Sequence, residues 1–120
     1  MKLMIHVYVT RKAAGNIESI TIDGHAGFAD PGEDIVCAAI SGISLGMINA
    51  VYNLLGIELP VVQGDGGYLE CRIPPFEQGE QEKVQLLMDA MISSLQSVAI
   101  EYGKYVKVHD RKVNRRWTSC

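Results

Sequence analysis

The sequence has few cysteines and lacks the patterns that join them into structural sites. Its 120 residues include three cysteines, an odd number that leaves no paired framework of disulfides. No Cys-x-x-Cys pair and no cysteine and histidine group has the spacing of a zinc site. We therefore expect reduced thiols, no metal and no cofactor.

The sequence also lacks a strong charge of either sign and a signal peptide. Its formal net charge of −3 gives no general reason to expect nucleic acid or an anionic membrane as a partner. The segment 107–116 is locally basic, so nucleic acid stays open only as a partner of the C-terminal tail. No uninterrupted apolar run approaches the ~20 residues that span a bilayer, and the N-terminus alternates instead of forming an apolar block. We expect a cytoplasmic protein without a membrane partner.

Hydrophobic periodicity in the first half of the chain predicts a hairpin followed by a long helix. Apolar residues alternate with polar ones within 3–22, on both sides of a turn signal at 14–16. The run 35–55 is apolar and free of proline, with Asp34 as a good N-cap residue and Gly56 as a stop. The helix should therefore begin directly after Asp34.

The second half repeats this order. A second hairpin is predicted over 59–73, because the glycines of 64–67 permit a tight turn. A helix over 78–102 and a short strand over 105–109 follow. The order ββαββαβ predicts an α+β fold in two layers, a largely antiparallel sheet with two helices.

We predict a single domain over 1–109 and a basic tail over 110–120, because no composition break or repeat divides the chain. The first helix is apolar around nearly its whole circumference. Small residues such as Ser41, Gly42 and Gly46 would let another backbone approach closely. These features favour a partner subunit, and we expect a homodimer.

Chemistry concentrates at His25 and Cys37. Cys37 would be the third residue of the helix, where the free N–H groups and the helix dipole favour a thiolate. His25 could serve as its base, since Gly27 and Gly32 let the intervening chain fold back. Each residue also has an ordinary structural explanation, because most free cysteines are buried apolar groups and histidines are common after strands.

Neighbouring residues could support this pair. Asp34 could orient His25 or only cap the helix, and Ser41 could lie near the sulfur or substrate or only permit packing. Cys71 alternates in phase with the inward face of its strand, and Cys120 is the last residue. Neither has a neighbouring base, so we expect both to be non-catalytic.

The residues around this pair resemble a known family. Asp-Gly-His-Ala-Gly at 23–27, followed by the segment 32–41 with Asp-Ile-Val-Cys, is similar to the signature of the ribosomal-processing cysteine proteases, the Prp family. Gly66-Gly67-Tyr68 resembles the family's glycine hairpin, and 94–102 resembles its second helix. The resemblance extends over about 3–109.

The resemblance implies an endopeptidase that removes a short N-terminal extension from a large-subunit ribosomal protein, the twenty-seventh in the usual naming. Cys37 would be the nucleophile and His25 its base. The resemblance also implies a compact homodimer, and a loop at 28–33 that orders around the substrate. Pro31 would make this loop stiffer than a glycine-rich version.

The expected mechanism is attack of the Cys37 thiolate on a peptide carbonyl, with N–H groups at the helix start as oxyanion donors. The peptide would lie against a sheet edge or in the space that opening of the loop exposes, and we expect it to carry apolar anchors. Two other classes stay open. One is a non-catalytic ribosome-associated binding module, and the other is a redox sensor that uses Cys71 or Cys120 as its resolving thiol.

Overall fold

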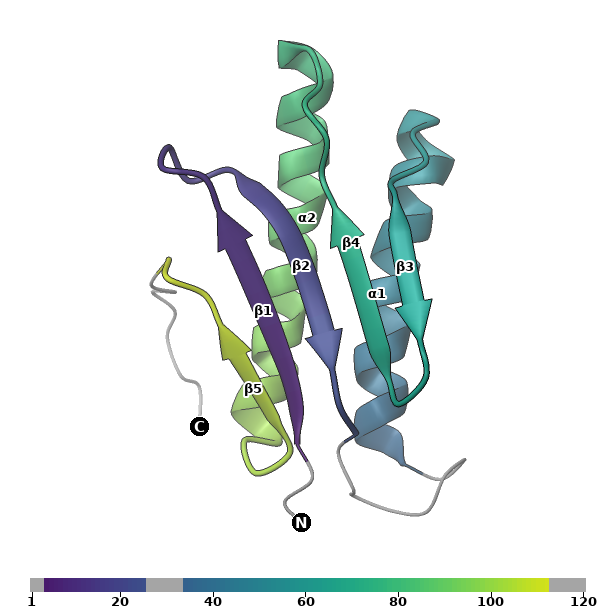
Figure 1. Cartoon of the computed structure of the whole chain (residues 1–120), viewed down its shortest axis with the longest axis vertical. Coiled ribbons are helices and arrows are strands. Elements are labelled where there is room, and N and C mark those ends of the chain that lie inside the picture. The colour runs from purple at the N-terminus through teal and green to yellow at the C-terminus, as the bar shows by residue number, and fades with distance from the viewer. Residues whose placement is uncertain (1–3, 26–33, 113–120) are drawn as a thin grey trace.

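A computed structural model describes residues 4–25 and 34–112 of the chain. The predicted order ββαββαβ and the α+β class are confirmed (Figure 1). The elements in chain order are β1 (Ile5–Arg11), β2 (Ile17–Asp23), α1 (Ile35–Leu55), β3 (Val61–Gly64), β4 (Tyr68–Arg72), α2 (Gln78–Glu101) and β5 (Val106–His109).

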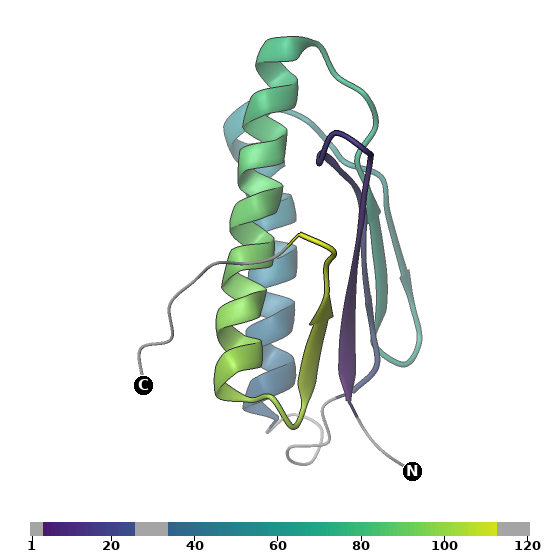
Figure 2. The same cartoon turned by 90° about the vertical axis from the view of Figure 1, so that its left-hand side faces the viewer.

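The five strands form one sheet in the order β3-β4-β2-β1-β5. All neighbouring strands are antiparallel except β5, which pairs with β1 in parallel. Both helices cover the same face of this sheet, so the opposite face is left without a helix (Figure 2). Ile20, Cys71, Met88 and Leu95 are fully buried and fill the space between the two layers.

Helix α1 begins and ends where the sequence predicts. Asp34 accepts hydrogen bonds from the N–H groups of Val36 and Cys37, both at 3.0 Å, as expected of an N-cap. Gly56 ends the helix with φ 70°, and its N–H donates to the Tyr52 carbonyl at 2.9 Å. The register of the helix is therefore fixed at both ends.

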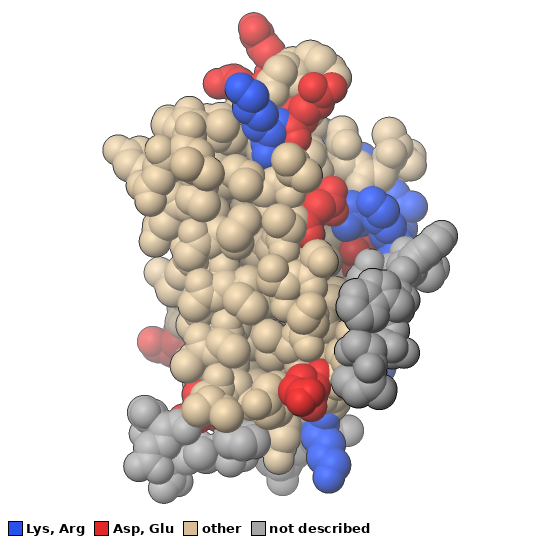
Figure 3. Space-filling view, turned by 180° about the vertical axis from the view of Figure 1, so that it is seen from behind, with Lys and Arg blue, Asp and Glu red and all other residues tan. Residues whose placement is uncertain are grey.

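The outward face of α1 carries no charge. Helix α1 packs on α2, and no Asp, Glu, Lys or Arg occurs among its residues. Seen from the helix side, the surface over α1 is a continuous uncharged area (Figure 3). With a mean hydropathy of 1.8 over 21 residues, α1 is long and apolar enough to cross a membrane by length and composition alone. The search for uninterrupted apolar runs did not detect this property of α1, because serines, glycines and asparagines interrupt its apolar residues without adding charge.

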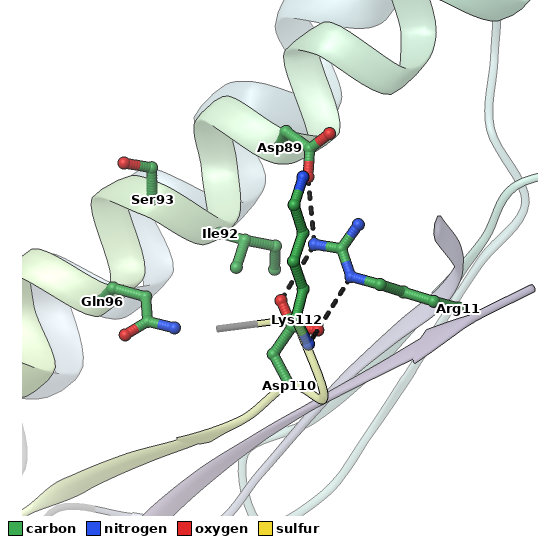
Figure 4. Close-up of a pocket in the computed structure, with 7 residues that line it drawn as sticks. All are labelled: Arg11, Asp89, Ile92, Ser93, Gln96, Asp110 and Lys112. Carbon is green, nitrogen blue, oxygen red and sulfur yellow. Dashed lines mark hydrogen bonds and ion pairs between the residues drawn. The ribbon is translucent and has the colours of Figure 1, made fainter. Parts of the chain in front are cut away.

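A buried ion pair ties β1 to the segment after β5. Arg11 donates from Nε to Asp110 at 2.8 Å, and both side chains are 3% exposed. Arg11 also donates to Asp89 of α2 at 3.0 Å (Figure 4). A further hydrogen bond from Arg11 to the Gly15 carbonyl measures 2.8 Å. Asp110, the first residue of the predicted tail, is thus packed against the sheet, whereas residues 113–120 lie outside the described part of the chain.

Candidate active site

Cys37 is the third residue of α1, at the N-terminal end of the helix, and it is half-buried. Its backbone N–H is held by Asp34, which also takes the N–H of Val36. The expected oxyanion donors are N–H groups at this helix start, and Asp34 Oδ1 already accepts two of them in this structure.

The end of β2 and the start of α1 lie at the same end of the molecule (Figure 1). His25 follows β2 after Gly24, since β2 ends at Asp23. Its side chain is exposed. The residue before it, Gly24, has φ 108°, and a Cβ atom added there would collide with the carbonyl oxygen of Met4. Only glycine fits this position, so the backbone that leads into His25 is closely confined.

The turn between β3 and β4 lies next to Gly24 and His25. Gly67 has φ 80°, and a Cβ atom added there would collide with the carbonyl oxygen of Gly24 and lie 3.4 Å from Cε1 of the His25 ring. Sequence reasoning missed this contact. A glycine-rich turn needs positive φ for its own geometry, so the sequence already had a sufficient explanation for Gly67.

Two adjoining cavities lie between α1 and the β3–β4 hairpin. The first, of about 140 Å³, is lined by Ser41, one helical turn beyond Cys37, and by Gly67, where an added Cβ atom would lie 3.4 Å from Cε1 of His25. The second, of about 370 Å³, shares Leu45 and Gln63 with it. Together the two cavities form a groove between α1 and the edge strand β3, which begins one helical turn beyond Cys37.

The structure thus brings Asp34, Cys37, Ser41 and His25 to one end of the molecule. Gly27 and Gly32, predicted to support the site, lie outside the described residues, as do the loop 28–33 and Cys120. Within the part of the chain that is described, no group of three or more His, Cys, Asp or Glu side chains could hold a metal ion.

Cys71 differs from Cys37 in its surroundings. It is 0% exposed in the core of the sheet. Burial raises the pKa of its thiol to about 11, so almost none of it is thiolate at neutral pH. Cys71 is therefore unsuited to be the resolving thiol of a redox sensor.

Comparison with known proteins shows what this arrangement is similar to. The family model for cysteine protease Prp matches residues 4–107, which include both His25 and Cys37. The chain belongs to the Prp family of cysteine proteases. Two relatives named ribosomal processing cysteine protease Prp support this. The one from Bacillus subtilis is 36% identical over 88% of this chain and 96% of its own length. The one from Staphylococcus aureus (strain Mu50) is 32% identical over 88% and 98%.

Solved structures of Prp agree with the computed fold. S. aureus Prp in complex with a covalently linked product peptide is 31% identical and superposes with a TM-score of 0.80, covering 88% of this chain and 98% of its own. The same protease in complex with a substrate peptide is 29% identical, with a TM-score of 0.75 over the same shares. The protein is therefore a cysteine protease. Its main activity is neither that of a non-catalytic binding module nor that of a redox sensor.

Proposed function

We propose that this protease removes an N-terminal extension from a large-subunit ribosomal protein, the twenty-seventh in the usual naming, and that it does so in the cytoplasm. The observation that carries the proposal is its similarity, over nearly their whole length, to relatives named ribosomal processing cysteine proteases. One such relative has been solved with substrate and product peptides. The domain 1–109 would carry the activity without the tail 110–120, since the family match ends at residue 107.

The proposed chemistry uses Cys37 and His25. His25 takes the proton from the Cys37 thiol, and the thiolate attacks the carbonyl carbon of the scissile bond. When the tetrahedral intermediate collapses, the C–N bond breaks and the leaving amine takes the proton from His25. Water, deprotonated by His25, then cleaves the thioester and restores the thiol.

The groove between α1 and β3 is the proposed seat of the peptide. Strand β3 is a sheet edge, so it can pair with an extended chain. The larger cavity beside it is lined by Leu45, Ile48, Leu59 and Val61, with Glu58 as its one carboxylate. This lining favours a substrate with apolar anchors close to the cleaved bond.

The function is tested by mass spectrometry of a precursor ribosomal protein that carries its N-terminal extension. We expect one cut near the N-terminus with the wild-type protease and none with Cys37→Ala. Cys71→Ala is the matched control, because it removes a thiol that is buried and protonated. A precursor that stays uncut with the wild-type protease would overturn the proposed substrate.

We further propose that a second copy of the chain covers the outward face of α1. Gly42 and Gly46 are exposed on this face, and no atom lies within 4 Å of a Cβ added at either position. Helix α1 contains no charged residue, and the surface over it is uncharged (Figure 3). An apolar surface with glycines at its centre allows two helices to pack closely, which supports a homodimer.

A further inference from the structure

The β3–β4 turn touches the backbone that carries His25. The carbonyl group of Gly24 belongs to the peptide unit that continues into the His25 nitrogen. A Cβ atom on Gly67 would collide with this carbonyl oxygen and lie 3.3 Å from its carbon. The turn therefore packs directly on the peptide bond between Gly24 and His25, with no side chain between the two backbones.

The same peptide unit is confined from the opposite side. A Cβ atom on Gly24 would collide with the Met4 carbonyl oxygen and lie 3.5 Å from the Cα of Ile5. The chain before β1 and the β3–β4 turn thus hold Gly24 between them. The His25 side chain is exposed, and no hydrogen bond to another described residue fixes its ring. Its direction accordingly depends on how this backbone is held.

We propose that Gly67 is a positioning residue for catalysis, which sets the place of the His25 imidazole through backbone contact. The proposal rests on the proposed function, in which His25 is the base for Cys37. Gly67 also lines the smaller cavity together with Ser41. Gly67 therefore lines the groove and also packs on the backbone that leads into His25, although it lies in the β3–β4 turn and His25 follows β2.

The test compares Gly67→Ala with Gly66→Ala. Both glycines have positive φ, 76° at Gly66 and 80° at Gly67, so alanine brings similar backbone strain to either position of the turn. A Cβ atom on Gly66 meets no atom within 4 Å, whereas one on Gly67 meets Gly24 and His25. The difference between the two variants isolates this contact.

We expect Gly67→Ala to lower kcat about 100-fold relative to Gly66→Ala with little change in KM, because a shift of about 1 Å in a catalytic group costs that much. Gly67→Ala should also unfold at a lower temperature than Gly66→Ala, because its Cβ atom collides with a backbone carbonyl, so kcat is compared at a temperature where both variants are folded. The pH dependence of Cys37 alkylation by iodoacetamide should move in Gly67→Ala toward that of His25→Ala, and in Gly66→Ala it should match the wild type. A merely structural role of Gly67 would not produce this separation.

Equal kcat values in the two alanine variants, or a change in KM alone, would overturn the proposal. If Gly67→Ala is unfolded at the assay temperature, both alanine variants are compared at a temperature below its unfolding transition, where each is folded. His25→Ala separates this inference from the proposed function. Full turnover in His25→Ala would show that His25 is not the base. If His25→Ala is inactive but the two glycine variants have equal kcat values, only the proposed role of Gly67 is wrong.

Discussion

At the scale of single residues, the sequence predicted what local chemistry dictates and missed what distant backbone contact dictates. Asp34 was predicted to cap α1 and does so, because an N-cap depends on its next three residues only. The contact of Gly67 with Gly24 could not be predicted, because it requires two hairpins to be placed against each other. His6 of β1 and His109 of β5 share a hydrogen bond of 3.0 Å, which likewise depends on the pairing of strands from opposite ends of the chain.

Asp34 offers a test that separates capping from catalysis. Asp34→Ala should lower the free energy of unfolding by about 1 kcal/mol, because two N–H groups lose their acceptor. Asp34→Ser keeps a cap and should restore stability. We predict that Asp34→Ser also restores turnover, measured as kcat. A stable but inactive Asp34→Ser would show instead that the carboxylate orients His25.

The buried pair of Arg11 and Asp110 should dominate local stability. Asp110→Asn should lower the free energy of unfolding by about 3 kcal/mol, because it leaves a buried guanidinium without its main partner. Asp89→Asn is the matched control. Asp89 binds the same guanidinium but is 41% exposed, so its loss should cost below about 1 kcal/mol. Chemical denaturation measures both, and equal losses would contradict this ranking.

The same pair predicts a dependence of stability on pH. Burial alone would raise the pKa of Asp110, but hydrogen bonds from Arg11 and from the Lys112 N–H together lower it below its ordinary value of 3.8. The unfolded chain therefore binds this proton more readily. The stabilisation should be complete above about pH 4 and be lost as the pH falls through the lowered folded value. Asp110→Asn should lack this contribution.

At the scale of elements, periodicity and turn chemistry located each helix and strand to within a few residues. Strand β3 was predicted from residue 59 but begins at Val61, since Pro60 has no N–H to donate to a neighbouring strand. The parallel pairing of β5 with β1 is not encoded locally. This pairing depends on α2 crossing the sheet and placing β5 beside β1, which no short stretch of sequence can predict.

Helix α1 provides the prediction at this scale. Gly42→Glu should convert the proposed homodimer into monomers, because it places a charge at the centre of the uncharged helix face. Gly79→Glu adds the same charge at an exposed position of α2 and should leave the dimer intact. Sedimentation velocity distinguishes the two. A wild type that is monomeric at micromolar concentration would contradict the proposed interface.

At the scale of the whole molecule, the chain is a Prp-family domain with additional residues after the family match ends at 107. The sequence predicted the fold class, which the structure confirms, and a site at the start of the first helix, which stays a prediction. It could not predict the buried contact of Asp110 with Arg11, because this contact joins residues that are far apart in the chain.

Truncations test where the functional domain ends. A chain that ends after Lys112 should keep its turnover and its unfolding temperature, because it retains Asp110. A chain that ends after His109 should lose about as much stability as Asp110→Asn, for the same physical reason. Loss of cleavage in the chain ending after Lys112 would show that the tail takes part in the reaction.

The central claim is that Cys37 forms a covalent acyl-enzyme with help from His25. The most direct measurement is the intact mass of the protease, quenched in acid during turnover of the extended ribosomal precursor. We predict an adduct equal to the released N-terminal fragment less one water, mapped to Cys37 by peptide analysis and absent from Cys37→Ala and His25→Ala. Cleavage without such an adduct, or an adduct on another residue, would contradict this account.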